Sequence, residues 1–156
     1  MSLAADILSL CRAHGWRIAT AESCTGGMVG AALTEVPGSS DVFDRGFITY
    51  SNDAKEDMLG VRADTLQAHG AVSEEVAAEM ALGALARSLA TLTVSVTGIA
   101  GPGGSDHKPE GRVCFGLATP DGVTTETVEF GALGREKVRL AATTHALSLL
   151  MQAARQ

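Results

Sequence analysis

The sequence has no apolar run long enough to cross a membrane. A spanning helix needs about 20 mostly apolar residues in a row, and the longest uninterrupted apolar stretches here are far shorter. The first residues also lack the basic segment, apolar core and cleavage site of a secretion signal. We therefore expect a soluble protein with no membrane partner, located in the cytoplasm.

Cysteine is scarce, and neither cysteine nor histidine follows a metal-binding pattern. Cys11, Cys24 and Cys114 are odd in number, widely separated and without C-x-x-C spacing. The histidines also lack metal-ligand spacing: His14, His69, His107 and His145. The sequence therefore predicts reduced thiols, no metal site and no cofactor.

Basic residues are outnumbered, with 12 Lys and Arg against 18 Asp and Glu and a formal net charge of −6. Proteins that bind DNA or RNA depend on clustered Lys and Arg, so we exclude nucleic acid as a partner. A small anionic ligand stays compatible, because a few backbone amides and one or two arginines bind phosphate whatever the global charge.

What the sequence does have is the pattern of one layered domain. Helices are expected over 3–15, 24–35, 52–59, 64–68, 73–89 and 135–153, and strands over 16–21, 43–50, 91–97, 113–118 and 123–130. Asp121-Gly122 is typical of a hairpin turn. With 46% hydrophobic residues and no repeat or linker, we predict a single α/β domain over 1–156. It is a layered α/β/α sandwich with a mixed, mainly parallel sheet and a late antiparallel hairpin.

Ser23 is the first candidate for chemistry. It lies in residues 20–27, Thr-Ala-Glu-Ser-Cys-Thr-Gly-Gly, between a short apolar run and a helix-like stretch. A nucleophile at such a strand-to-helix junction points toward the first free amides of the helix, which stabilise an anion. The alternative is an N-cap, the commonest role of a serine before a helix.

Lys55 is the candidate base. Residues 50–55 lie at the carboxyl end of a neighbouring strand, where ligand sites of α/β sheets collect. A neutral lysine there can take the proton of Ser23, which requires a pKa depressed by desolvation or by nearby positive charge. Sequence spacing alone favours the alternative, a solvated lysine on a helix face.

The remaining candidates concern anion binding and a rival nucleophile. Residues 97–104 follow a strand and resemble a glycine-rich anion cradle without the Walker A ending; the alternative is a flexible connector. Arg135 and Arg139 lie one turn apart and can grip a phosphate, although surface arginines are equally ordinary there. Cys24 is a weaker nucleophile candidate because no histidine sits in a pattern that would activate it. Glu22 and Glu110, the nearest acids, are candidates to orient the lysine or contact ligand.

Six sequence blocks together resemble one known family, the CinA C-terminal domain family, over nearly the whole chain. The blocks are residues 21–27, 37–40, 50–55, 70–73, 97–102 and 108–111, and their order and spacing are more specific than any one of them. The resemblance implies nicotinamide-nucleotide amidase activity, in which nicotinamide mononucleotide is hydrolysed to nicotinic acid mononucleotide and ammonia for pyridine-nucleotide salvage.

The resemblance also implies the site residues. The family's serine, lysine and tyrosine match Ser23, Lys55 and Tyr50, the predicted catalytic residues. Its threonine before the glycine loop matches Thr97, and its late-helix arginine matches Arg135 or Arg139. The predicted substrate-binding residues are Cys24, Thr25, Gly26, Asn52, Thr97, Gly98, Gly101, Arg135 and Arg139.

One departure from the family pattern and one alternative function accompany this interpretation. Glu110 stands where the family pattern suggests a small apolar residue. Longer relatives carry an additional N-terminal domain, so the chain resembles the stand-alone amidase. Some family members lack amidase activity, which leaves a phosphorylated-nucleotide sensor as the alternative function. We expect a homo-oligomer, because the apolar final helix can cover a partner as readily as the sheet.

Overall fold

The structure, a computed structural model, describes residues 2–156. One five-stranded sheet has the order β2-β1-β3-β4-β5, with β1 (Ile18–Glu22), β2 (Phe43–Ile48), β3 (Leu92–Gly98), β4 (Arg112–Thr119) and β5 (Gly122–Glu129). β1 pairs in parallel with β2 and β3, whereas β4 is antiparallel to β3 and β5. Only β4 therefore runs against the other strands, and the predicted mixed sheet with a late hairpin is confirmed.

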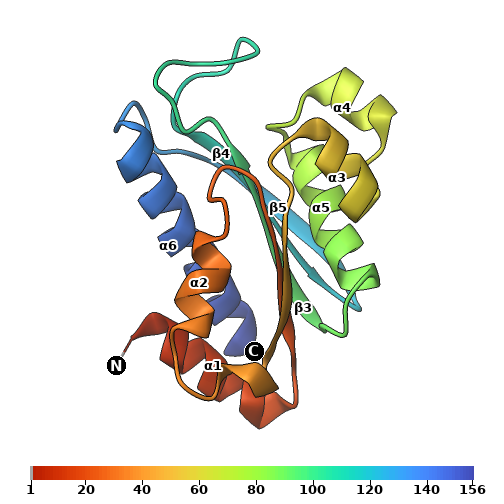
Figure 1. Cartoon of the computed structure of the whole chain (residues 1–156), viewed down its shortest axis with the longest axis vertical. Coiled ribbons are helices and arrows are strands. Elements are labelled where there is room, and N and C mark those ends of the chain that lie inside the picture. Colours follow the sequence, from red (N-terminus) through yellow and green to blue (C-terminus); the bar gives the residue numbers. More distant parts are fainter. Residues whose placement is uncertain (1) are drawn as a thin grey trace.

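Helices cover both faces of the sheet (Figure 1). On one face lie α1 (Leu3–His14), α2 (Met28–Thr34) and α6 (Arg135–Ala154); on the other lie α3 (Asn52–Leu59), α4 (Ala63–His69) and α5 (Glu74–Ala86). A short 3-10 helix, η1 (Ser39–Asp41), precedes β2. The predicted α/β/α sandwich is confirmed, and each face has its own apolar core.

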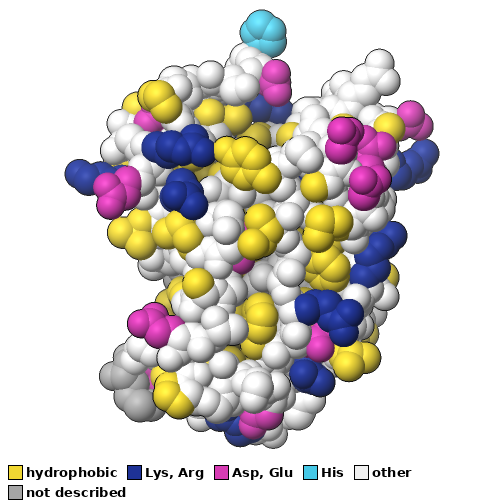
Figure 2. All heavy atoms as spheres, in the orientation of Figure 1, with side chains coloured by type: hydrophobic (Ala, Val, Ile, Leu, Met, Phe, Trp, Pro, Cys, Tyr) yellow, Lys and Arg dark blue, Asp and Glu magenta, His cyan; other side chains and the backbone are white. Residues whose placement is uncertain are grey.

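The surface is mixed in charge. On the face drawn in Figure 2, Lys and Arg side chains are interspersed with Asp and Glu, and apolar side chains lie between them. Among residues 2–156, none of the helices is both long and apolar enough to span a membrane.

The second helix begins later than the predicted range of 24–35. Residues 23–27 form turns instead, and α2 starts at Met28. Gly26 and Gly27 have φ values of 58° and 107°, a left-handed conformation that interrupts a right-handed helix and that glycine adopts without a steric penalty. Hydrophobic periodicity does not register this backbone reversal, so the predicted start was wrong.

The order of the strands leaves a crevice at one edge of the sheet. The chain passes from β1 through α2 to β2 on one side of β1, then returns through α3, α4 and α5 on the other face to reach β3 on the opposite side. Such a reversal of strand order is where α/β sheets bind ligands, outside the carboxyl ends of the strands. The loops after β1, β2 and β3 all leave the sheet at this edge.

Candidate active site

Ser23 directly follows β1 and stands at the carboxyl edge of the sheet. Its amide donates to the Val96 carbonyl at 2.9 Å, which continues the pairing with β3, and its own carbonyl accepts from the Gly26 amide at 3.0 Å. The cap position of α2 is Gly27 rather than Ser23. The N-cap alternative for Ser23 is therefore wrong, and its hydroxyl lines a cavity.

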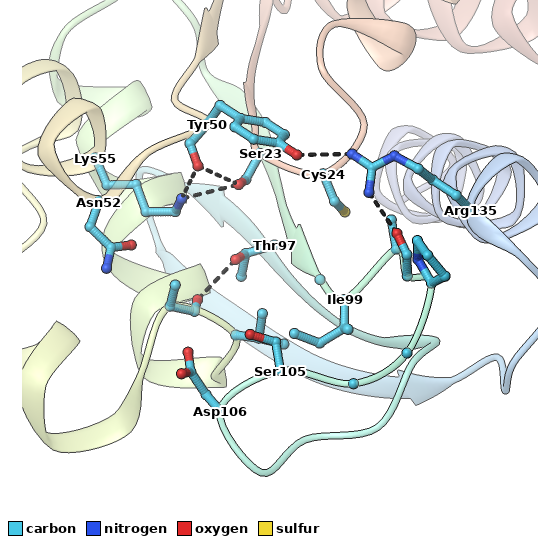
Figure 3. Close-up of a pocket in the computed structure, with 18 residues that line it drawn as sticks. Ser23, Cys24, Tyr50, Asn52, Lys55, Thr97, Ile99, Ser105, Asp106 and Arg135 are labelled. Carbon is cyan, nitrogen blue, oxygen red and sulfur yellow. Dashed lines mark hydrogen bonds between the residues drawn. The ribbon is translucent and has the colours of Figure 1, made fainter.

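Lys55 reaches Ser23 from α3. Ser51 begins this helix by accepting the Ala54 amide at 3.0 Å, which places Lys55 in the first turn. The Lys55 ammonium nitrogen, Nζ, lies 3.0 Å from Ser23 Oγ and bonds the carbonyls of Thr49 and Tyr50 at 3.0 and 3.2 Å (Figure 3). Its side chain is 1% exposed, so the alternative of a solvated lysine is wrong.

Burial gives Lys55 the electrostatics of a base. Desolvation lowers the pKa of Lys55 to about 8, because the low-dielectric surroundings disfavour the charged amine. A neutral amine 3.0 Å from a hydroxyl is placed to accept its proton. Of the two causes offered by the sequence, desolvation is the one that operates.

The serine and lysine open into a cavity of about 350 Å³ at the crevice. Loops after β1, β2 and β3 and the start of α6 form its walls (Figure 3). The predicted site residues that line it are Ser23, Cys24, Tyr50, Asn52, Lys55, Thr97, Gly98, Gly101 and Arg135.

The rest of the wall comes from the 71–72 segment and from the loop after β3: Ala71, Val72, Ile99, Ala100, Pro102, Gly103, Gly104, Ser105 and Asp106. The candidate anion cradle over 97–104 covers five of these residues, whereas Ala71, Val72, Ser105 and Asp106 were not assigned from the sequence. Thr97 Oγ1 donates to the Ala71 carbonyl at 2.9 Å, and Lys108 Nζ donates to the carbonyls of His69 and Val72. The signals for this wall were the glycine-rich pattern over 97–104 and the family-like blocks 70–73 and 97–102, because no periodicity marks loop contacts.

Tyr50 contributes to the site through both its backbone carbonyl and its phenol. Its carbonyl accepts from Lys55, and Ser23 Oγ lies 3.4 Å from it. Its phenol points away from this pair toward α6, where Arg135 donates to the phenol oxygen at 2.9 Å (Figure 3). Arg135 also donates to the Gly101 carbonyl at 2.7 Å. The tyrosine and arginine together close one end of the cavity.

Three predicted substrate-binding residues do not line the cavity. Arg139 Nε donates to the Cys24 carbonyl at 3.0 Å, and its Nη2 lies 3.4 Å from the Thr25 carbonyl. Thr25 is fully buried, and its hydroxyl donates to Glu22. Gly26 belongs to the same turn, next to the Arg139 guanidinium. Arg139 thus supports the serine turn from behind.

The Glu22 carboxylate accepts hydrogen bonds from the amides that begin α2. Glu22 is 1% exposed, and its carboxylate accepts hydrogen bonds from the Thr25 hydroxyl at 2.6 Å, the Gly27 amide at 3.2 Å and the Val29 and Gly30 amides at 2.9 Å. The expectation that these amides serve the Ser23 side chain is therefore wrong. Glu22 also does not bond Lys55, because its oxygens face the start of α2.

Glu110 organises the glycine-rich loop. Its two carboxylate oxygens accept the Gly103 amide at 2.7 Å and the Gly134 amide at 2.9 Å. The carboxylate therefore ties the loop to the residue that begins α6, where Arg135 follows. This departure from the family pattern has a structural role in the cavity wall.

The surroundings of Cys24 weigh against a cysteine nucleophile. The side chain is 5% exposed, and burial raises the pKa of the Cys24 thiol to about 11. Because the thiolate is the reactive form, the thiol is almost entirely protonated at neutral pH. Among residues 2–156, no three His, Cys, Asp or Glu side chains gather as a metal-binding group.

The fold and the site define an α/β/α sandwich protein with a buried serine–lysine pair at the carboxyl edge of parallel strands. The chain belongs to the family described as CinA C-terminal domain, whose model matches residues 1–154.

Named relatives and solved structures agree with this assignment. The chain is 49% identical over 153 residues to the nicotinamide-nucleotide amidohydrolase PncC of Escherichia coli strain K12, covering 97% of this chain and 93% of that protein. It is 55% identical over 138 residues to a CinA-like protein of Chlorobium phaeobacteroides, covering 86% of this chain and 33% of that longer protein. The crystal structure of the competence/damage inducible protein CihA from Agrobacterium tumefaciens superposes with a TM-score of 0.94 at 50% identity, covering 99% of this chain and 94% of that one.

Proposed function

We propose that this protein hydrolyses the carboxamide of nicotinamide mononucleotide to nicotinic acid mononucleotide and ammonia, with Ser23 as nucleophile and Lys55 as general base. The observation that carries the proposal is the 3.0 Å contact between Lys55 Nζ and Ser23 Oγ inside a cavity. The name of the E. coli relative, a nicotinamide-nucleotide amidohydrolase, supports the choice of substrate.

The first half of the reaction forms an acyl-enzyme. Neutral Lys55 accepts the Ser23 proton while Oγ attacks the carboxamide carbon. The tetrahedral intermediate then expels ammonia, and Lys55 returns the proton to the leaving nitrogen. The nicotinoyl group of the nucleotide is left as an ester on Ser23.

The second half releases the acid. Lys55, neutral again, takes a proton from a water molecule that attacks the ester carbon. The carbon–oxygen bond to Ser23 breaks, Lys55 returns the proton to Oγ, and nicotinic acid mononucleotide leaves. One base therefore serves both halves, as in other serine–lysine sites.

The oxyanion is assigned to the backbone after Ser23. In the described chain, the amides of Cys24 and Thr25 donate to no other protein group. The amide after a nucleophile is a recurrent oxyanion donor, and Cys24 lines the cavity. Thr25 is fully buried and outside the cavity wall, so we assign the oxyanion contact to the Cys24 amide.

The ribosyl phosphate is assigned to the opposite end of the cavity. Arg135 lines the cavity and is held in place by Tyr50 and Gly101, whereas Arg139 faces the back of the serine turn. Of the two arginines that the sequence left open, we choose Arg135. The other predicted substrate-binding residues that line the cavity are Asn52, Thr97, Gly98 and Gly101.

Ammonia release tests the proposal. Purified protein with nicotinamide mononucleotide should release ammonia, and Ser23→Ala should lose at least about 10³-fold in kcat while keeping its melting temperature. Binding measured by calorimetry without ammonia release would instead indicate a nucleotide sensor. A small loss in Ser23→Ala would exclude Ser23 as the nucleophile. Active protein would supply nicotinic acid mononucleotide to pyridine-nucleotide salvage.

A further inference from the structure

We propose that Arg139 is a positioning residue, which holds the turn after Ser23 in the arrangement that presents the Cys24 amide to the oxyanion. This inference rests on the hydrolysis proposed above and adds a residue to it. Arg139 lies on α6, is partly buried and is absent from the cavity wall. Its effect on the reaction must therefore pass through the backbone.

Arg139 fixes two successive peptide groups. Its Nε donates to the Cys24 carbonyl at 3.0 Å, and its Nη2 is 3.4 Å from the Thr25 carbonyl. In a trans peptide the N–H points opposite to the carbonyl. The amides of Thr25 and Gly26 are therefore directed away from the guanidinium.

The Gly26 amide, oriented in this way, in turn orients the peptide group between Ser23 and Cys24. It donates to the Ser23 carbonyl at 3.0 Å, and so fixes the direction of that carbonyl. By the same trans geometry, the Cys24 amide points to the opposite side. Two hydrogen bonds therefore link the guanidinium on α6 to the peptide that carries the Cys24 amide: Arg139 to the Thr25 carbonyl, and the Gly26 amide to the Ser23 carbonyl. Ser23 and Cys24 both line the cavity, where the oxyanion forms.

The Arg139 guanidinium packs closely against the turn at Gly26. Gly26 has a φ of 58°, and a Cβ on it would lie 3.3 Å from Arg139 Nη2. On the other side of the turn, Glu22 accepts the Thr25 hydroxyl and the Gly27 amide. The turn is thus held between a guanidinium and a carboxylate, neither of which faces the cavity.

The charge of Arg139 also strengthens the amides that it orients. A cationic donor on a carbonyl polarises the whole peptide, so the N–H of that peptide becomes a stronger donor. The Gly26 amide shares its peptide with the Thr25 carbonyl and donates to the Ser23 carbonyl, whose peptide carries the Cys24 amide. Arg139 therefore helps to stabilise the developing negative charge without touching the substrate.

Steady-state kinetics on Arg139→Ala, Arg139→Lys and Arg135→Ala separate positioning from phosphate binding. Arg139→Ala should lose about 10²-fold in kcat, the scale of losing one oxyanion donor, with KM changed by less than about twofold. The loss should be equal for the mononucleotide and for its riboside, and added ethylguanidinium should restore part of it. Arg139→Lys, which cannot form the fork, should also lose kcat and tests the proposal if the alanine variant does not fold.

Arg135→Ala is the matched contrast, because it should raise KM for the phosphorylated substrate instead. An unchanged kcat in Arg139→Ala, or a rise in KM confined to the mononucleotide, would overturn the positioning role while leaving the hydrolysis intact. A wild-type protein that releases no ammonia would overturn both.

Discussion

Lys55 is a long basic side chain in a place that disfavours its charge. It is 1% exposed, and its three hydrogen bonds go to neutral oxygens of Ser23, Thr49 and Tyr50. Two of these acceptors are backbone carbonyls of the two residues directly after β2, which the chain presents whatever side chains it carries. Sequence motifs identified the lysine, but its burial depends on how α3 packs against this edge.

The pH dependence of kcat/KM follows from this burial. Because burial lowers the pKa of Lys55 to about 8, most of the free protein holds a protonated lysine below that pH. We expect kcat/KM to rise about tenfold per pH unit below pH 8 and to level off above it. Ammonia release measured at subsaturating substrate from pH 6 to 9.5 gives the profile. A profile that is flat or falls over this range would contradict a neutral lysine base.

The elements that carry the site differ in how far the sequence predicted them. The apolar pattern and the caps predicted β1, β3 and α3 closely, because burial and capping are local signals. The start of α2 was misplaced because it depends on the left-handed Gly26 and Gly27 and on the Glu22 carboxylate. That carboxylate acts across five to eight residues, beyond the reach of the usual capping pattern.

Packing between α3 and α5 places the helix that carries Lys55. A Cβ on Gly83 of α5 would overlap the Leu59 carbonyl at the end of α3. Gly→Ala in a helix interior normally stabilises by up to about 1 kcal/mol. Here we expect Gly83→Ala to destabilise by about 1–3 kcal/mol through overpacking and to lower kcat, because α3 must move.

Urea unfolding and ammonia release measure both effects of Gly83→Ala. Gly30→Ala is the control, since a Cβ there meets no atom closer than 3.4 Å. A Gly83→Ala variant as stable as the wild type would show that α3 and α5 are not fixed by this contact.

At the scale of the whole molecule, topology brings distant loops to one cavity. The sequence predicted the three layers and the edge of the sheet at which Ser23 and Lys55 meet. It did not predict that 71–72 and 105–106 complete the cavity beside the glycine-rich loop, because that wall is held by side chains of Thr97 and Lys108 bonding distant carbonyls. The predicted single domain and homo-oligomer stay predictions.

Burial of Lys55 should also appear in the stability of the whole chain. An unfolded lysine titrates near 10.5 and the folded one near 8, so between these values the unfolded state binds more protons. Stability then rises with pH, by at most about 1.4 kcal/mol per unit from this group. We expect the free energy of unfolding of the wild type to increase from pH 8 to 10 relative to Lys55→Met, as measured by urea unfolding. A difference that stays constant over this range would exclude the depressed pKa.

The activation of Ser23 by neutral Lys55 can be measured without any substrate. A fluorophosphonate should label Ser23, identified by peptide mass spectrometry, at a rate that rises with pH to a plateau with a midpoint near 8. Lys55→Met should label at least about 10²-fold more slowly. Labelling at another residue, or equal rates in wild type and Lys55→Met, would contradict the serine–lysine pair on which the proposed hydrolysis depends.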